Sequence, residues 1–116
     1  MGASRRAATV FGVLLAFAAP ARSQSSFLAF EAGPVRPLAL TPDGSRHLAC
    51  NIPDNRLEIF AVSTDGLTHL GSVPVGMEPV AVAARSNTEA WVVNHLSDSV
   101  SVVDLAASPP RVTRTL

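Results

Sequence analysis

Lysine is absent from this 116-residue chain, and all nine of its basic residues are arginines. The arginines are spread along the chain and do not gather into one basic stripe. Contact with a nucleic-acid backbone needs clustered Lys and Arg side chains, so the sequence argues against a nucleic-acid partner. The length is enough for one small domain.

Cysteine is almost as scarce, because Cys50 is the single one in the sequence. No disulfide can form within the chain, so packing must hold the fold together. Cys50 ends the apolar run Leu48-Ala49-Cys50, where a small hydrophobic core residue is expected. A reactive thiol would need a partner such as His47. That residue is three positions away on the same predicted strand, where alternation directs the two side chains to opposite faces.

Motifs of catalysis and cofactor binding are also missing. The sequence has no Cys-x-x-Cys-His, no glycine-rich phosphate loop before a helix and no Gly-x-Ser-x-Gly elbow. His47, His69 and His95 lack metal-ligand spacing, and no cysteine joins them. We therefore predict no catalytic residue, no metal site and no cofactor, and we assign no cofactor-binding residue.

The acidic residues fall mostly in predicted turns, where Asp bonds to the local backbone. Asp54 and Asp98 recur at similar places in two polar connections and could face a shared opening that binds Ca²⁺. Such a site needs about six oxygen ligands, which no dense Asp/Asn loop supplies, so a calcium site is the weaker alternative. The turn acids are Asp43, Asp54, Asp65, Asp98 and Asp104.

The N-terminus has the pattern of a secretory signal peptide. Arg5-Arg6 form a basic start, Ala7–Ala19 is a mostly apolar run of 13 residues, and Ala21 and Ser23 are small residues at cleavage spacing. A membrane-spanning helix needs about 20 apolar residues, so this run is too short for an anchor. We predict a leader over residues 1–23, and periplasmic or extracellular localisation.

Cleavage after Ser23 would leave Gln24 as the first residue, with Ala21 as a second possible boundary. Three of the nine arginines would leave with the leader, so six Arg against nine acids give the mature chain a net charge near −3. The Arg5-Arg6 pair permits twin-arginine export, but Ala7-Ala8-Thr9 is weakly apolar for that route. The sequence leaves the choice between the general secretory and the twin-arginine route open.

Beyond the leader, apolar residues come in short runs bounded by turn residues. Short Val/Leu/Ile-rich runs of this kind predict strands, and no segment after Arg22 has a helical pattern. The runs are Phe27–Phe30, Leu38–Leu40, His47–Cys50, Leu57–Val62, Leu67–Val75, Val80–Ala84, Ala90–Val93, Val100–Leu105 and Val112–Leu116.

The segments between the runs contain specific turn signals. Thr41–Ser45 places Pro and Asp before a glycine, and Ser63–Gly66 repeats the Asp-Gly pair. Asn51 and Asn94 each open a longer polar connection, where an Asn side chain can bond the turn backbone and tolerates left-handed geometry. These signals predict hairpin connections between successive strands.

The chain contains an internal repeat. Its opening recurs at an offset of 42, from Pro37 to Pro79, and later segments recur at an offset of 43. A period near 40 residues with four strands per unit indicates a β-propeller blade. The matched segments are Val35–Leu40 with Met77–Val82, His47–Asn51 with Ala90–Asn94, and Leu57–Val62 with Val100–Leu105.

These repeats resemble the YVTN-type β-propeller family over about residues 33–116. The resemblance rests on the Pro-x-Ala opening, the Thr41–Gly44 turn, the strand end Trp91–Asn94 and the run Ser99–Asp104. In the first repeat, Leu48–Asn51 occupies the position of the tetrapeptide that gives the family its name, and it matches that tetrapeptide less closely. The resemblance implies two antiparallel four-stranded blades. It also implies that Trp91 packs between blades, with a role in a ligand surface as the alternative.

We predict four segments: the leader, an N-terminal strand in residues 24–34 that could close a ring, blade 1 over 35–76 and blade 2 over 77–116. The first strand of each blade is apolar on both faces, which predicts cover on both sides. A closed propeller needs roughly four to eight blades. The chain is therefore expected to be an N-terminal fragment whose exposed sheet faces require the missing blades or self-association.

The favoured function is a non-catalytic binding or scaffolding module of the bacterial cell envelope, with an unknown protein or small molecule as its ligand. The alternative is part of a propeller enzyme that resembles lactone hydrolases, or of a propeller that holds a redox cofactor. The residues of such sites would come from several blades near the axis. Fold alone does not decide between these functions.

Overall fold

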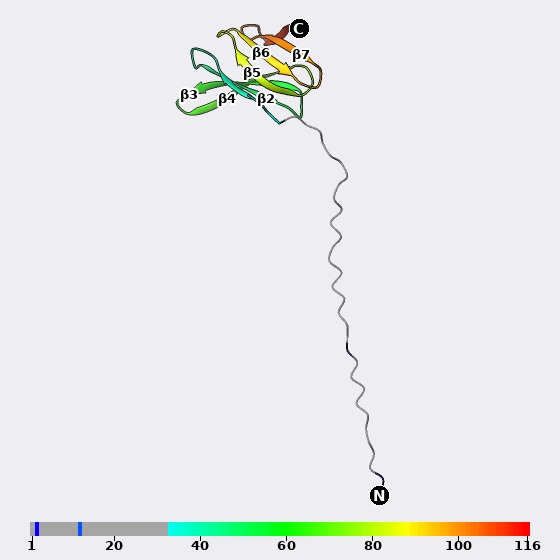
Figure 1. Ribbon diagram of the computed structural model, residues 1–116. Helices are drawn as coiled ribbons and strands as arrows, with labels where there is room; N and C mark the ends of the chain where they lie inside the picture. The colour runs from blue at the N-terminus through cyan, green and yellow to red at the C-terminus, as the bar shows by residue number, and fades with distance from the viewer. Residues whose placement is uncertain (1, 3–11, 13–32) are drawn as a thin grey trace.

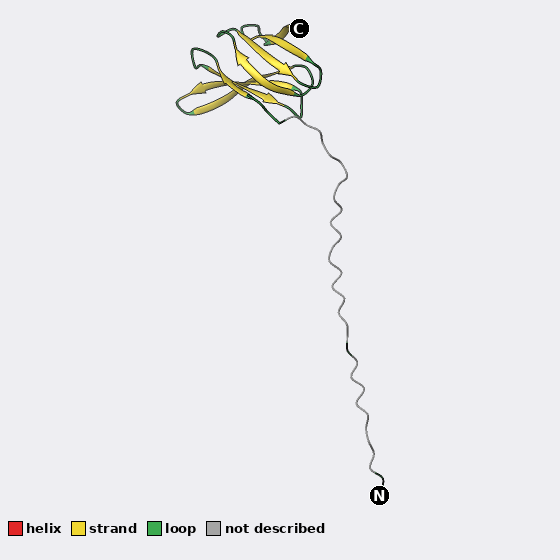
Figure 2. Cartoon of the chain, viewed as in Figure 1, coloured by secondary structure: helices red, strands yellow, loops and turns green. Residues whose placement is uncertain are grey.

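The computed structural model describes Gly2, Gly12 and residues 33–116. The predicted cleavage after Ser23 and the predicted strand Ser26–Ala32 lie outside the described residues. Within that part of the chain every regular element is a strand (Figure 2), as predicted. The described residues include no helix with the length and apolarity needed to cross a membrane.

The eight strands form two four-stranded antiparallel sheets that pack together in a layered unit (Figure 1). Within each sheet the strands are neighbours in chain order, which is the meander of a propeller blade. Blade 1 consists of β1 (Leu38–Leu40), β2 (Arg46–Asn51), β3 (Arg56–Ser63) and β4 (Gly66–Pro74). Blade 2 consists of β5 (Pro79–Ala84), β6 (Glu89–Asn94), β7 (Ser99–Asp104) and β8 (Arg111–Thr115).

The predicted turn between β1 and β2 is present. Gly44 has a φ of 70°, and its N–H donates to the Thr41 carbonyl over 2.8 Å. The Asp43 carboxylate accepts hydrogen bonds from the Thr41 hydroxyl at 2.7 Å and from the Ser45 N–H at 3.0 Å. These bonds lower the pKa of Asp43 below its ordinary value. The turn is therefore specified by residues within five positions of one another.

The two polar connections also repeat in three dimensions. Asn55 and Asp98, which lie 43 positions apart, both have left-handed backbones with φ values of 55° and 45°. Asn51 and Asn94 do not have a positive φ, and they act through their side chains. Asn51 bonds to both the backbone and the carboxylate of Asp54. The left-handed residue therefore falls four positions after the asparagine that opens each connection.

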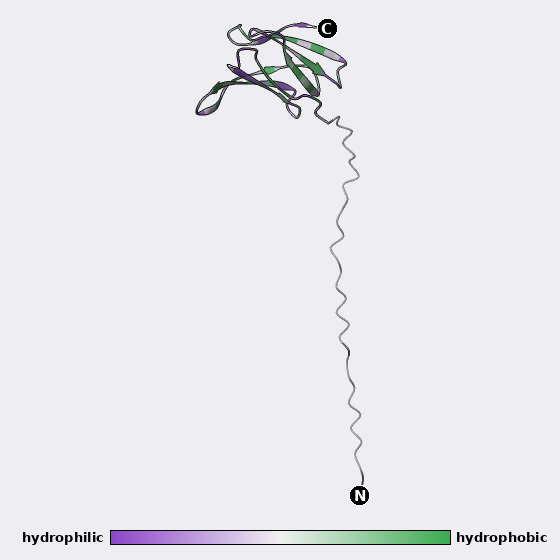
Figure 3. Cartoon of the chain, turned by 60° about the vertical axis from the view of Figure 1, so that its left-hand side comes forward, coloured by the Kyte–Doolittle hydropathy of each residue, from purple (hydrophilic) through white to green (hydrophobic). Residues whose placement is uncertain are grey.

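A single core lies between the two blades. Leu48, Leu57 and Ile59 of blade 1 meet Val92 and Val103 of blade 2, and all five side chains are at most 1% exposed. Figure 3 shows hydrophobic stretches along the strands of both sheets. Burial of a Val, Leu or Ile side chain contributes about 1.5–3 kcal/mol, so this interface is the main source of stability in the described part.

Three side-chain hydrogen bonds join the edges of the blades, and one of them runs from the Asp43 N–H to the Asn87 side chain over 3.0 Å. The Arg46 guanidinium donates to the Leu105 carbonyl over 2.6 Å, and the Asn55 side chain accepts from the Glu78 N–H over 2.8 Å. The connection from β4 to β5 contains the predicted boundary between residues 76 and 77. These contacts hold the two sheets in one orientation.

Strand β1 is apolar on both faces but is covered on only one, as expected for a sheet that has a single neighbouring blade. Leu38 and Leu40 are 58% and 56% exposed, whereas the corresponding Val80 and Val82 of β5 are 6% and 4% exposed. The reason is the position of each strand. The valines face blade 1, while the leucines are on the side of blade 1 that points away from blade 2 and has no described neighbour.

Candidate functional site

The face of blade 1 that points away from blade 2 is called here the blade-1 free face. It carries an open hollow of about 510 Å³ that is lined mainly by apolar side chains, with Asn51 of β2 and Glu58 of β3 as its polar members. Phe60 also contacts the His69 ring edge-on, at 5.2 Å between centroids. The hollow is lined by Pro34, Pro37, Leu38, Ala49, Cys50, Asn51, Ile52, Pro53, Glu58 and Phe60.

A cluster of polar side chains borders this hollow. The Glu58 carboxylate is central: it binds His69 Nε2 at 2.8 Å through one oxygen and accepts from Ser72 at 3.0 Å and Asn51 at 3.2 Å through the other. Arg56 Nε donates to the Ser72 hydroxyl over 2.6 Å. Glu58 and Ser72 are direct cross-strand partners on β3 and β4, so the sheet register builds the cluster.

The electrostatics of the cluster favour an ionised Glu58. Partial burial alone would raise the pKa of this carboxyl, but the hydrogen bonds from His69, Asn51 and Ser72 outweigh it and lower the pKa below its ordinary value. Ser72 and His69 bind different oxygens of the same carboxylate, and Ser72 also accepts from Arg56. The serine hydroxyl is therefore bonded to the acid and not to a histidine base, which is the wrong arrangement for a nucleophile.

Cys50 lies at the edge of the same hollow and is half-buried against the core. Burial raises the pKa of its thiol to about 11. At neutral pH the thiol is protonated, so it behaves as a small hydrophobic group. This agrees with the packing role predicted from the sequence.

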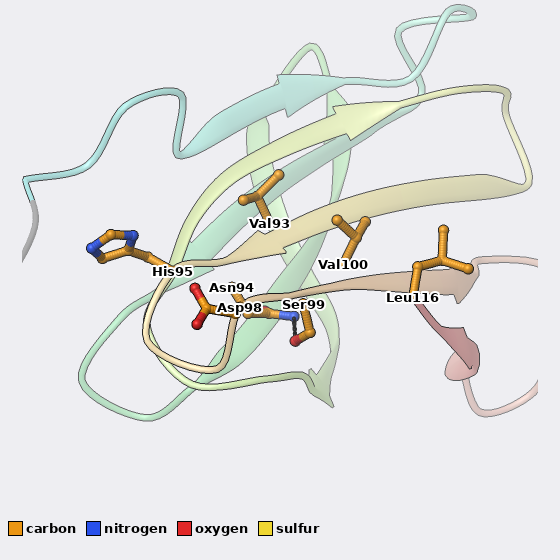
Figure 4. A pocket seen from close by; sticks show the side chains of 7 residues that line it. All are labelled: Val93, Asn94, His95, Asp98, Ser99, Val100 and Leu116. Atoms are coloured by element: carbon orange, nitrogen blue, oxygen red, sulfur yellow. Dashed lines mark hydrogen bonds between the residues drawn. The ribbon is translucent and has the colours of Figure 1, made fainter.

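A second hollow, of about 370 Å³, lies beside the connection between β6 and β7 (Figure 4). Val93, Val100 and Leu116 project to one side of the sheet and form its apolar wall. Its polar wall contains Asn94, which is 1% exposed and donates to Ser99 at 3.2 Å. His95 and Asp98 complete the lining, and the His95 ring points away from the other side chains.

Trp91 lies on the face of blade 2 that points away from blade 1, called here the blade-2 free face. It does not pack between the two described blades. Its indole N–H donates to Glu89 over 2.8 Å, and its ring lines an apolar groove of about 230 Å³ together with Arg36. Arg36 reaches this groove because residues 35–36 pair in parallel with β5 at Ala81.

The structure keeps the sequence-predicted ionisable residues apart. Within residues 33–116, no three His, Cys, Asp or Glu side chains lie close enough to hold a metal ion. Asp54 is bonded to Asn51, and Asp98 lines the hollow beside β6 and β7. The alternative of a shared calcium opening therefore gains no support from the geometry.

Sequence reasoning missed the Glu58 cluster. No motif in the sequence singles out Glu58, and His69 lacks metal-ligand spacing. The Ser63–Gly66 turn sets the antiparallel register that places Ser72 opposite Glu58, and this part could have been inferred. The register shift between Ile59 and Phe60, which pairs Phe60 with His69, had no sequence signal.

Comparison with known protein families finds no family model that matches the chain, and no curated protein is significantly similar to it. The class of the protein is therefore defined by its fold. It is an all-β protein of two four-stranded antiparallel sheets, consistent with two propeller-like blades. The YVTN-type resemblance stays a prediction from the repeated residues.

Proposed function

We propose that this protein is an exported β-propeller repeat protein of the YVTN type, which acts as a non-catalytic binding or scaffolding module of the bacterial cell envelope. The leader pattern of residues 1–23 supports export. The repeat of 42–43 residues and the two blade-like sheets support the propeller. In this proposal the described blades are the first two of a larger ring.

One observation carries the binding role: the sheets expose broad, partly apolar faces with open hollows. Leu38, Leu40 and Val93 are each more than 40% exposed, and the hollows of about 510 and 370 Å³ are bounded by both apolar and polar side chains. Contiguous apolar surface with polar borders is typical of sites that bind other molecules. The polar side chains beside these hollows, such as Glu58 and Asn94, are hydrogen-bonded to neighbouring side chains and so stabilise the strands and turns that carry them.

Export is tested by expressing the full 116-residue sequence in a bacterium and determining the N-terminus of the purified protein by mass spectrometry. We expect the protein in the periplasm or medium, beginning at Gln24 or near Ala21. Leu14→Arg interrupts the apolar run of the leader and should keep the protein inside the cell. A wild-type protein that stays in the cytoplasm with Met1 or Gly2 intact would contradict the proposal.

The non-catalytic role is tested on the same purified protein. We expect no turnover of lactones and no absorbance of a bound haem or quinone after purification. Turnover that is lost in Glu58→Gln, or a stoichiometric bound chromophore, would favour the propeller-enzyme or redox alternative instead.

A further inference from the structure

The two free faces of the chain correspond to the two halves of the interface that already joins its blades. On blade 1, the side that contacts blade 2 carries Leu48, Cys50, Leu57 and Ile59. At the repeat offset of 43, the corresponding residues of blade 2 are Trp91, Val93, Val100 and Val102, which belong to the blade-2 free face. The blade-2 free face is therefore a second version of the surface that blade 1 uses to bind blade 2.

The blade-1 free face corresponds in the same way to the side of blade 2 that contacts blade 1. Its positions correspond, at offsets of 42 and 43, to residues of blade 2 that are buried against blade 1. The free positions are Leu38, Leu40, His47, Ala49 and Phe60, and their counterparts are Val80, Val82, Ala90, Val92 and Val103. Each of these counterparts is at most 6% exposed. The blade-1 free face is therefore a second version of the surface that receives a blade.

We propose that a second copy of this chain docks head to tail, with the blade-2 free face of one copy on the blade-1 free face of the next. The contact repeats the blade 1–blade 2 interface between molecules. It would cover Leu38, Leu40 and Val93, which are among the most exposed large hydrophobic side chains of the described strands. The inference rests on the two sheets and their repeat, and not on the proposed binding role.

Two departures from the repeat support pairing between these faces. Where blade 1 has Gly71 beside Ile59, blade 2 has the exposed Arg114 beside Val102. Where blade 2 has the buried Ser101, blade 1 has Glu58. The blade-2 free face therefore carries Arg36 and Arg114 against one acid, Glu89, and the blade-1 free face carries the ionised Glu58. This difference in charge favours association of unlike faces over like faces.

A head-to-tail contact either closes into a ring or continues as a filament. Propellers close with roughly four to eight blades, so two blades per copy give rings of about two to four copies. The number of copies rests on the propeller assignment proposed above. The head-to-tail contact itself depends only on the two faces.

The test uses one blocking substitution on each face. Leu40→Arg places a charge on the blade-1 free face, and Val93→Arg does so on the blade-2 free face. Both side chains are exposed within the chain, so the variants should fold as the wild type does. Leu96→Arg, at an exposed leucine in the connection between β6 and β7, is the matched control. All proteins are expressed from the full sequence, and far-UV circular dichroism checks their folding.

Native mass spectrometry and sedimentation velocity then give the number of copies. We expect two to four copies for the wild type and for Leu96→Arg, and monomers for each blocked variant alone. An equimolar mixture of Leu40→Arg and Val93→Arg, one of them carrying a small tag, should form a mixed pair. In that pair the intact blade-2 free face of Leu40→Arg contacts the intact blade-1 free face of Val93→Arg. The two faces that remain uncovered both carry the blocking arginine, so growth stops at two copies.

Three results would overturn the proposal: a monomeric wild type, loss of association in only one of the two variants, or folded variants that stay monomeric when mixed. Loss in a single variant would instead indicate pairing between like faces. A wild type that grows beyond four copies, together with a mixed pair from the variants, would uphold the head-to-tail contact and contradict the propeller assignment.

Discussion

At the residue scale, Glu58 is the most informative side chain of blade 1. Its counterpart in blade 2 is the buried Ser101, which contacts Asn94, just as Glu58 contacts Asn51. The repeat thus keeps the asparagine and changes its partner. In blade 1 the larger acid also reaches His69 and Ser72 across the sheet. One substitution between repeats therefore converts a small buried contact into a charged cluster on an open face.

The lowered pKa of Glu58 predicts acid sensitivity. When folding lowers the pKa of a carboxyl, that group stabilises the native state at pH values above its pKa in the unfolded chain. This stability is lost as the pH falls through the pKa of the folded state. We expect the thermal midpoint of the wild type to fall between about pH 5 and pH 3, and Glu58→Gln to flatten part of this decline. Circular dichroism melts across this range measure it.

Asp65→Asn removes a carboxyl from the exposed Ser63–Gly66 turn and controls for the loss of one negative charge. Some decline should persist in Glu58→Gln, because hydrogen bonds also lower the pKa of Asp43 and of Glu89. If Glu58→Gln and Asp65→Asn gave the same profile as the wild type, the hydrogen bonds to Glu58 would make no net contribution to stability.

At the element scale, the connection between β4 and β5 sets how closely the blades approach. Gly76 lies against the end of β6, where an added Cβ would be 2.6 Å from the Asn94 side chain and 2.6 Å from the Ser97 hydroxyl. Asn94 is buried and bonded to Ser99 and Ser101, so it has little room to move. Close approach of backbone to side chain requires glycine here.

Gly76→Ala should therefore destabilise the protein by about 1–3 kcal/mol through overpacking. Urea denaturation at a fixed protein concentration measures the change. Gly71→Ala is the matched control, since a Cβ at Gly71 meets no atom within 4 Å. The control should be neutral or stabilising by up to about 1 kcal/mol. Equal effects of the two substitutions would show that the connection can shift to relieve the contact.

At the scale of the whole molecule, the exposed faces weaken an isolated copy. Each large apolar side chain left in water forgoes about 1.5–3 kcal/mol of burial, while net domain stability is only about 5–15 kcal/mol. Leu38, Leu40 and Val93 together therefore represent a large share of the stability that a third blade would add. We expect an isolated copy to be less stable as a monomer than in an assembly, so that the wild type associates and a copy kept monomeric binds a hydrophobic dye.

Association of the folded form makes the melting temperature depend on protein concentration. We expect a tenfold increase in concentration to raise the thermal midpoint by about 3–8 °C for a chain of this size. Val93→Arg should remove this dependence and Leu96→Arg should keep it. A sharp, cooperative melt of a monomer at every concentration would mean that two blades are sufficient, and that the apolar faces need no cover.

The amino-acid sequence by itself determined the strands, the turns and the period of the repeat. These features are local: short apolar runs between turn residues predict β2 and β6, and the Thr41–Gly44 turn closes on hydrogen bonds between residues at most five positions apart. The packing role of Cys50 followed from the apolar run in which it lies. The left-handed residues Asn55 and Asp98 escaped prediction, because Asn, Asp and several neighbours all tolerate that backbone.

Tertiary structure decided which face of each sheet is covered. Leu40 and Val82 occupy corresponding positions in equally apolar strands, yet one is exposed and the other is buried. Their difference comes from the neighbour on each side of the sheet, which is information that no local pattern contains. The same holds for the Glu58–His69 contact, which depends on a register shift opposite Ile59 and Phe60. Burial and cross-strand contacts join residues far apart in the chain, so only the packed sheets could assign them.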